Sequence, residues 1–206
     1  MLRSKGGYKF IDLFAGIGGM RLGFEANGFQ CLFSSEWDKY AQITYQSNFH
    51  EFPAGDITQI NAADIPSHNV LVAGFPCQPF SKAGKGLGLH DSRGHMFFEI
   101  QRIIEFHRPD VFLLENVRQL FMHDGGKTYE LIRGILEGDI SKLPKSISLQ
   151  KSLRETLKFD LDYKIYPCVL NAKDYGLPQS RERLYMVGFR KKLLKIVNLS
   201  FHGQPH

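Results

Sequence analysis

The chain has 206 residues, of which 43% are hydrophobic and 23% charged, and this suits one soluble globular domain with a substantial core. No apolar segment is long enough to span a bilayer, and the N-terminus lacks the apolar core and cleavage site of a signal peptide, so we expect a cytoplasmic protein. The net charge of +5 is compatible with nucleic-acid binding but does not establish it.

The three cysteines are Cys31, Cys77 and Cys168, and no two of them form a C-x-x-C pair. Their odd number and their spacing argue against a disulfide framework and against a cysteine-based zinc site, so we expect no metal. Cys31 and Cys168 lie in apolar, strand-like stretches, where core packing is the expected role of a free thiol.

The first half of the chain alternates apolar runs with segments of helical spacing. We expect Gly28 to stop the first helix and Asp38 to cap the second. The expected elements are strands over 8–14, 30–34 and 70–73, a strand-like edge at 55–58, and helices over about 19–27 and 38–48.

The second half continues the alternation. One helix is predicted by apolar residues at helical spacing, namely Met96, Phe97, Ile100, Ile103 and Ile104. The other expected elements are a strand over 110–114, a helix over 128–136, a polar loop over 138–148, a helix over 149–161, and closing strands over 163–166 and 184–189. Strands that alternate with helices imply an α/β fold with a parallel sheet.

Chemically capable groups stand at five expected strand ends. Because parallel strands end at a common edge of their sheet, these groups are expected to lie side by side there. They are the turn at 14–19, the pair Glu36-Trp37, Asp56, Cys77 and Glu115.

Cys77 is the candidate nucleophile. It lies in the tract 74–81, Gly-Phe-Pro-Cys-Gln-Pro-Phe-Ser, directly after the apolar run 70–73. A structural cysteine would more naturally lie inside the run, whereas a thiol in the loop that follows a buried strand stands where such sheets place ligands and chemistry.

The first two strand ends together suggest an adenosine-type ligand. A glycine-rich turn that opens a helix lets backbone N–H groups approach a ligand, although it is equally typical of a tight strand–helix junction. Glu36 ends the second strand, where an acidic residue grips ribose hydroxyls, and Trp37 offers a stacking face for a purine. The alternative is a surface acid beside a partly buried tryptophan.

Each of the remaining polar groups has two possible roles. Asp56 either accepts from an exocyclic amine or caps a turn. Glu115 follows four apolar residues, so we expect partial desolvation to raise its pKa and make proton donation possible near neutrality, unless backbone donors satisfy it. Arg181 and Arg183, two apart on extended backbone, face the same way and either hold a base carbonyl or phosphate or form a solvated face.

Seven ordered blocks in this chain resemble those of the DNA (cytosine-5) methyltransferase family of bacterial restriction–modification systems. The resemblance runs from about Lys9 to Arg190. The blocks are Asp-Leu-Phe-Ala-Gly-Ile-Gly-Gly at 12–19, Glu-Trp-Asp-Lys-Tyr-Ala at 36–41, Gly-Asp-Ile at 55–57, the tract 74–81, Asp-Ser-Arg-Gly at 91–94, Glu-Asn-Val at 115–117, and the stretch 171–183 that ends in Gln-Ser-Arg-Glu-Arg.

The resemblance implies a Rossmann-like, S-adenosylmethionine-dependent methyltransferase with a mixed, mostly parallel sheet and helices on both faces. It implies that the Cys77 thiolate adds to C6 of a cytosine flipped out of duplex DNA, and that Glu115 protonates or hydrogen-bonds N3. Arg183 would contact the base carbonyl and Arg181 would support the same pocket. Attack of C5 on the methyl group and loss of the C5 proton would then release Cys77.

The resemblance also assigns binding residues. For S-adenosylmethionine it implies Phe14, Gly16, Ile17, Gly18, Glu36, Trp37, Asp56, Ile57 and Pro76. For DNA it implies Gln78, Ser81, Lys82, Lys85, His90 and Arg93, which lie in or beside a glycine-rich loop that would close over the duplex.

Residues 1–206 are expected to form a single catalytic domain. In the family, a target-recognition domain and two further conserved blocks follow this region, and the last block completes the methyl-donor pocket. We therefore expect either one subunit of a split enzyme, completed by a second chain, or an excised fragment, or a persisting non-catalytic binder. The segment 138–157 is a candidate docking surface for a partner.

Three other functions compete with DNA methylation. One is cytosine-5 methylation of RNA, because one branch of the family modifies tRNA. A second is non-catalytic binding of S-adenosylmethionine or nucleic acid. A thiol-dependent hydrolase is the third, but no histidine has a recognisable place as its base.

Overall fold

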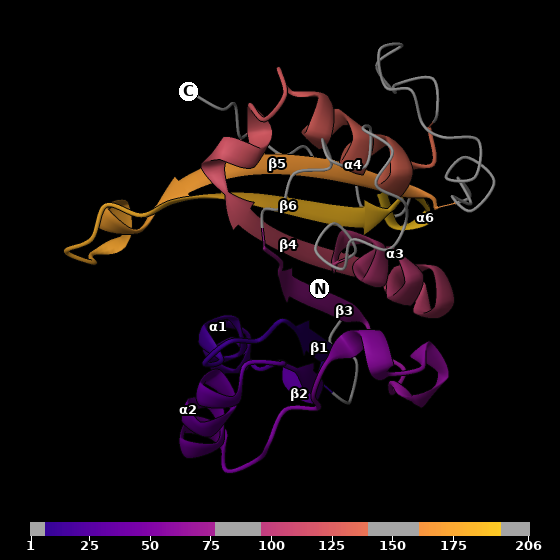
Figure 1. Ribbon diagram of the computed structural model, residues 1–206. Helices are drawn as coiled ribbons and strands as arrows, with labels where there is room; N and C mark the ends of the chain where they lie inside the picture. Colours follow the sequence, from indigo (N-terminus) through magenta and orange to yellow (C-terminus); the bar gives the residue numbers. More distant parts are fainter. Residues whose placement is uncertain (1–6, 77–95, 140–160, 195–206) are drawn as a thin grey trace, which may run out of the picture. The chain divides into compact units, whose positions relative to one another are not determined.

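The computed structural model describes residues 7–76, 96–139 and 161–194 (Figure 1). These residues form two compact units, one built from Met1–Phe75 with Phe98–Leu114 and the other from Pro76–Phe97 with Glu115–His206. We describe each unit by itself. Whether 1–206 functions as a single catalytic domain stays a prediction.

Six strands occur in the hydrogen-bonded order β2-β1-β3-β4-β6-β5. Both neighbours of β1 run parallel to it, whereas β5 and β6 are antiparallel. The mixed, mostly parallel α/β sheet predicted from the sequence is therefore confirmed. In the part of the chain that the structure describes, no helix combines the length and the apolar character that crossing a bilayer needs.

The first unit begins with alternating strands and helices. Its elements are β1 (Lys9–Leu13), α1 (Gly19–Ala26), β2 (Gln30–Ser35), α2 (Lys39–Phe49), the short 3-10 helices η1 (Ile57–Gln59) and η2 (Ala62–Asp64), and β3 (Val70–Gly74). It also contains nearly all of α3 (Met96–His107) and the start of β4 (Val111–Val117).

The core of this unit lies on and beside its parallel strands. Phe10, Val70 and Val72 are buried together, and Phe24 of α1 packs against them. Phe24 also meets the Phe10 ring at 5.1 Å and the Phe29 ring at 5.2 Å. Cys31 packs in the same cluster, as predicted for a structural thiol. The buried side of α3 carries the predicted stripe of Phe97, Ile100, Ile103 and Ile104.

Local signals set the helix ends as predicted. The Asp38 side chain accepts hydrogen bonds from the backbone N–H groups of Tyr40 and Ala41, which satisfies two donors that the first turn of α2 leaves free. After α1, Gly28 adopts a φ of 80°, the left-handed conformation that favours glycine. The strand-like edge predicted at 55–58 is wrong, since Ala54 makes one isolated bridge to Ser35 and the chain then turns into η1.

The second unit is built around an antiparallel pair. Its elements are the end of β4, the 3-10 helix η4 (Arg118–Phe121), α4 (Lys127–Glu137), β5 (Tyr163–Asn171), the 3-10 helix η6 (Ala172–Tyr175), β6 (Glu182–Arg190) and α6 (Lys191–Leu194). Both closing strands are longer than predicted, because they pair over nine residues each, from Tyr163↔Arg190 to Asn171↔Glu182. The loop and helix predicted at 138–148 and 149–161 fall largely outside the described residues.

A buried carboxylate joins α4 to β5. Glu137 is 1% exposed and accepts a hydrogen bond from the backbone N–H of Ile165 at 3.1 Å. Arg133 lies 3.4 Å from its second oxygen, which compensates the buried charge. The polar end of α4 is thereby tied to the strand on which its apolar face rests.

Two histidine rings meet in the first unit. His68, which is 7% exposed, and His107, at the end of α3, lie 4.7 Å apart between ring centroids. The ring N–H of His68 donates to the carbonyl of Pro66, and that of His107 donates to the carbonyl of Ala62, both at 2.8 Å. The pKa of His68 is lowered to about 4, mainly by burial, with the Pro66 hydrogen bond opposing the fall and the charge of His107 adding to it.

This burial predicts an acid-sensitive fold. Because the folded pKa of His68 lies below the unfolded value of 6.5, the unfolded state binds the proton more tightly, and stability falls as the pH drops from about 6.5 towards 4. Over that range the free energy of unfolding should fall in the wild type by up to about 3 kcal/mol more than in the His68→Phe variant. Urea denaturation at a series of pH values measures this, and equal slopes for the two proteins would contradict it.

Candidate functional site

The turn after β1 is a tight backbone loop whose shape depends on glycine. Phe14, Gly16 and Gly18 all have positive φ, at 56°, 56° and 89°. A Cβ on Gly18 would lie 2.0 Å from the Phe49 ring, so no other residue fits there. A Cβ on Gly16 would meet nothing within 4 Å, so the space beside that backbone is open. The turn thus offers a bare backbone surface beside the start of α1.

Glu36 organises this turn from the end of β2. Its two carboxylate oxygens accept hydrogen bonds from the backbone N–H groups of Gly16 and Asp38, both at 2.8 Å. Glu36 is 7% exposed, so it is no surface acid. Each carboxylate oxygen has two acceptor positions, so these bonds leave capacity for a ligand hydroxyl.

Exposed apolar side chains surround the same turn. Trp37 is 76% exposed, the reverse of the partly buried tryptophan considered as the alternative above. Ile17 is 56% exposed, and its backbone carbonyl accepts a hydrogen bond from the Asn48 side chain of α2. An uncovered indole directly beyond a buried carboxylate can stack on a flat ring system.

Asp56 caps η1, which was one of its two predicted readings. One of its oxygens accepts from the Thr58 N–H at 2.9 Å, and Ile57, the first residue of η1, is 2% exposed. Both residues belong to the first unit, as do the glycine turn, Glu36 and Trp37.

Two charged groups beneath the turn escaped sequence reasoning. Asp12, the second-last residue of β1, is fully buried. Burial raises its pKa to about 7, although Arg21 acts to lower it. Arg21 of α1 is itself 8% exposed and bonds to Tyr45, Glu25 and Glu51. An arginine inside an otherwise amphipathic helix was the available signal, but only Glu25 is near in sequence, whereas Tyr45 and Glu51 lie 24 and 30 residues away.

In the second unit, Glu115 forms an ion pair with Arg183. The Arg183 Nε lies 2.8 Å from a Glu115 oxygen, and each side chain is about a fifth exposed. Burial raises the pKa of Glu115, as predicted, while Arg183 and then Arg181 lower it. Glu115 lies inside β4, which continues to Val117, and not at a strand end as predicted.

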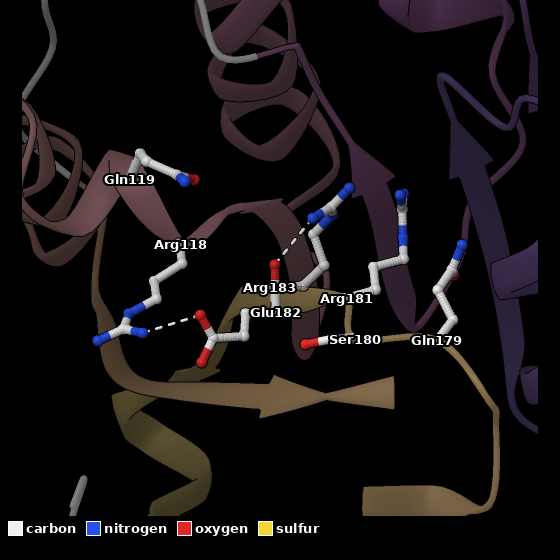
Figure 2. A pocket seen from close by; sticks show the side chains of 7 residues that line it. All are labelled: Arg118, Gln119, Gln179, Ser180, Arg181, Glu182 and Arg183. Atoms are coloured by element: carbon white, nitrogen blue, oxygen red, sulfur yellow. Dashed lines mark hydrogen bonds and ion pairs between the residues drawn. The ribbon is translucent and has the colours of Figure 1, made fainter. Parts of the chain in front are cut away.

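A polar cavity of about 320 Å³ opens beside this pair (Figure 2). Glu182, the first residue of β6, lies between Arg181 and Arg183 in sequence, and its side chain pairs with Arg118 at 2.8 Å. Three arginines against one glutamate make this lining suited to an anionic or carbonyl group. The lining residues are Arg118, Gln119, Gln179, Ser180, Arg181, Glu182 and Arg183.

Asn171 shapes the turn that presents these arginines. Its side-chain oxygen accepts from the backbone N–H groups of Lys173 and Arg181, and its amide donates to the hydroxyl of Ser180 at 3.3 Å. Asn171 is nearly buried at the end of β5. Sequence reasoning placed it in a family block but assigned it no role.

Of the predicted site residues not yet considered, the structure describes only Pro76. Pro76 is exposed at the end of a described segment. The candidate nucleophile Cys77 and the predicted DNA contacts Gln78, Ser81, Lys82, Lys85, His90 and Arg93 lie outside the described residues. Among the residues that are described, no group of three or more His, Cys, Asp or Glu side chains could hold a metal ion.

Comparison with known proteins identifies the family. The family model for C-5 cytosine-specific DNA methylases matches residues 8–138 and 144–204. This chain is a C-5 cytosine-specific DNA methylase family member. The turn, the Glu36-Trp37 pair and the Glu115–Arg183 pair all lie within the matched residues.

The methylase relatives are about twice as long as this chain. Type II methyltransferase M.HaeII of Haemophilus aegyptius is 54% identical over 186 residues, which are 90% of this chain and 52% of that protein. M.HhaI of Haemophilus parahaemolyticus is 47% identical over 195 residues, which are 95% of this chain and 53% of that protein. The chain thus spans about half the length of these relatives.

Solved structures agree with the fold. A prophage-encoded protein of E. coli, described as a DNA modification methyltransferase, superposes with a TM-score of 0.65 at 25% identity, covering 97% of this chain and 52% of that chain. Spodoptera frugiperda DNMT2 has the same TM-score at 23% identity, covering 97% of this chain and 53% of its own, which supports the fold alone.

The ion pair predicts how Glu115 titrates in this chain. Since Arg183 lowers the Glu115 pKa, Arg183→Met should raise it, and Arg181→Met should raise it by less. Arg118→Met, whose partner is Glu182, should leave it unchanged. Carbon-13 NMR titration of the Glu115 carboxyl measures its pKa in all three variants. A lower Glu115 pKa in Arg183→Met than in the wild type would contradict the assignment.

Proposed function

We propose that this chain carries the chemistry of methyl transfer from S-adenosylmethionine to C5 of a cytosine in DNA. The observation that carries this proposal is the family match across most of the chain. The half-buried Glu115–Arg183 pair beside an arginine-lined cavity supports it, because a desolvated carboxyl and fixed guanidinium groups are what activation of a pyrimidine ring requires.

The proposed reaction begins with a nucleophile, because C5 of cytosine does not attack a methyl group unaided. The Cys77 thiolate forms a bond to C6, and the electron pair of the C5–C6 double bond moves into the ring. The proton of Glu115, whose raised pKa favours the protonated form, is donated or hydrogen-bonded to N3 and stabilises that charge. Arg183 contacts the base carbonyl, and Arg181 supports it.

The methyl donor, when bound, would supply an electrophilic methyl group, to which the electron pair at C5 would form a bond as the sulfur–methyl bond breaks and S-adenosylhomocysteine leaves. The C5 proton then leaves to a base, the C5–C6 double bond re-forms, and the Cys77 thiolate is expelled. Every bond made to the enzyme is thereby broken again. Free thiols are mostly protonated at neutral pH, so this route benefits from positive charge near Cys77.

The first unit fits such a donor. The open space beside Gly16 accommodates a close backbone approach, and the Glu36 carboxylate has acceptor capacity for ribose hydroxyls. Trp37 is exposed and available to stack on the purine, with Asp56 and Ile57 as further contacts. Phe14, Ile17 and Gly18 complete the proposed donor set in this unit.

DNA is the proposed substrate, and target recognition is proposed to need further polypeptide, supplied as a second chain or segment. The relatives are about twice as long as this chain. Apolar side chains around the donor turn support the need for a cover, because Ile17, Trp37, Tyr40 and Ile43 are 56–82% exposed. The net charge of +5 suits a polyanionic substrate.

Covalent trapping tests the proposal. The chain is mixed with S-adenosylmethionine and a duplex library that contains 5-fluorocytosine, whose C5–F bond prevents release of the thiol. The half of M.HaeII that this chain does not match is added in one arm and omitted in the other. We expect a denaturation-stable adduct at Cys77 by mass spectrometry, and none with Cys77→Ala.

The arms separate the alternatives. An adduct that needs the added half supports a divided enzyme, and an adduct without it means that this chain suffices for the chemistry. Labelling of a 5-fluorocytosine tRNA but of no duplex would replace DNA by RNA as the substrate. No adduct in any arm, with donor binding shown by calorimetry, would favour a non-catalytic binder.

A further inference from the structure

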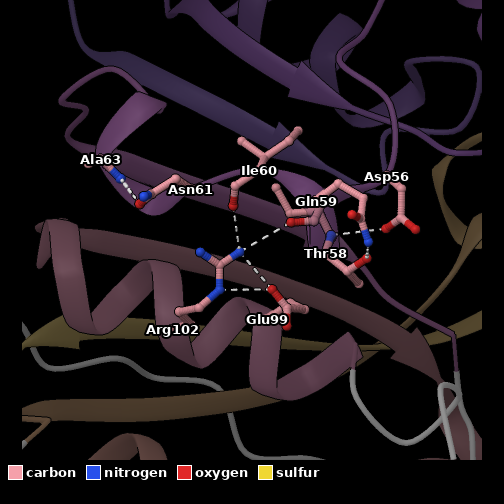
Figure 3. Close-up of polar contacts among 9 residues, drawn as sticks. Asp56, Thr58, Gln59, Ile60, Asn61, Ala63, Glu99 and Arg102 are labelled. Atoms are coloured by element: carbon pink, nitrogen blue, oxygen red, sulfur yellow. Dashed lines mark hydrogen bonds and ion pairs between the residues drawn. The ribbon is translucent and has the colours of Figure 1, made fainter.

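One arginine of α3 clamps the segment that precedes η2 (Figure 3). The Nη2 of Arg102 donates to the backbone carbonyls of Ile57 at 3.1 Å and Ile60 at 3.0 Å. These two carbonyls stand at the beginning and just beyond the end of η1. A single guanidinium therefore holds both sides of a three-residue turn.

Glu99, one turn earlier on α3, fixes that guanidinium. One Glu99 oxygen lies 2.8 Å from the Arg102 Nε and 2.7 Å from its Nη2. The Glu99 side chain is 19% exposed and that of Arg102 is 36% exposed, so the pair is shielded on one side. Arginine suits this task, because its planar fork carries several donors in fixed directions, whereas lysine carries one compact charge.

The other end of the same turn is held by Asp56. Its side chain accepts from the Thr58 N–H, and its carbonyl accepts from the Gln59 N–H at 3.0 Å. The turn is thus fastened at its start by its own cap and along its carbonyl side by a helix that is more than forty residues away in sequence. Asp56 and Ile57 are the residues proposed above to contact the purine of the methyl donor.

We propose that Arg102, oriented by Glu99, is a positioning residue that sets the affinity of this chain for its methyl donor by fixing Asp56 and Ile57. The inference rests on the proposed function. Hydrogen bonds from a charged donor are stronger than neutral ones, so loss of Arg102 frees the carbonyl side of η1 while the Asp56 cap remains. The purine then meets a segment that must be ordered on binding.

The matched experiment uses three variants of the whole chain. Arg102→Met keeps the aliphatic stem and removes every donor, and Arg102→Lys keeps the charge without the fork. Arg133→Met removes an arginine of α4 that pairs with Glu130 and Glu137, far from η1 in sequence, and serves as a destabilised control. Binding of S-adenosylhomocysteine and of adenosine is measured by calorimetry, well below each melting temperature.

We expect Arg102→Met to weaken both ligands by about tenfold, which corresponds to about 1.4 kcal/mol. Arg102→Lys should fall between it and the wild type, and Arg133→Met should lower the melting temperature without changing either affinity. Equal losses for both ligands locate the effect at the adenosine moiety that they share, and not at the homocysteine. In hydrogen exchange of the ligand-free chain, the amides of 58–60 should exchange faster in Arg102→Met, less so in Arg102→Lys, and at the wild-type rate in Arg133→Met.

Wild-type affinity in Arg102→Met, with a melting temperature lowered as in the control, would show a purely structural role and overturn the inference alone. Failure of the wild-type chain to bind S-adenosylhomocysteine, both alone and with the unmatched half of M.HaeII added, would overturn the proposed function and this inference together. Unchanged exchange of 58–60 in Arg102→Met would show that the turn does not depend on the arginine, and would overturn the inference whatever the affinities.

Discussion

The Glu36 carboxylate holds the glycine turn at 14–19 together. Its two oxygens bond to backbone N–H groups on either side, one in the turn after β1 and one at the entry to α2. A buried carboxylate is costly unless it is fully hydrogen-bonded, so the two bonds both stabilise Glu36 and determine where the turn lies. Gly16 and Gly18 can take the required positive φ, and the Phe49 ring closes the space beside Gly18. The open backbone beside Gly16 results from this arrangement.

In the second unit, an antiparallel pair of strands positions the charged side chains. The neighbouring residues Glu182 and Arg183 at the start of β6 have different partners, so Arg183 meets Glu115 while Glu182 meets Arg118. The two ion pairs differ in kind. The Glu115–Arg183 pair is partly desolvated and alters how the carboxyl titrates, whereas the Arg118–Glu182 pair is half-exposed and contributes little to stability.

Short-range features of this fold were readable from the sequence. The cap of α2 by Asp38, the apolar stripe of α3 and the closing strands follow from periodicity and from side chains that bond to their own neighbours. The sequence did not show that β4 continues beyond Glu115, because the length of a strand depends on its partner strand. The turn at 55–58 was mistaken for a strand edge, since a cap and an isolated bridge resemble a strand end in one dimension.

Long-range bonds explain what sequence reasoning missed. Arg102, Asn171 and Arg21 act on backbone or side chains that are 10 to 45 residues away, and a single chain gives no sign of such partners. The family blocks did draw attention to the residues that the arrangement serves. Arg21 and Arg102 lie outside the blocks, where a polar residue on a helix is easily taken for an ordinary solvated side chain, and Asn171 lies inside one, where the sequence does not show which backbone groups it bonds.

Trp37 gives this chain a built-in optical reporter. It is the only tryptophan of the 206 residues, and it is 76% exposed directly beyond Glu36. The indole emission of the whole protein therefore originates at one point of the donor turn, where water surrounds most of the ring. Any molecule or polypeptide that covers the turn would change the colour and the quenching of that emission without a label, an antibody or a change of sequence.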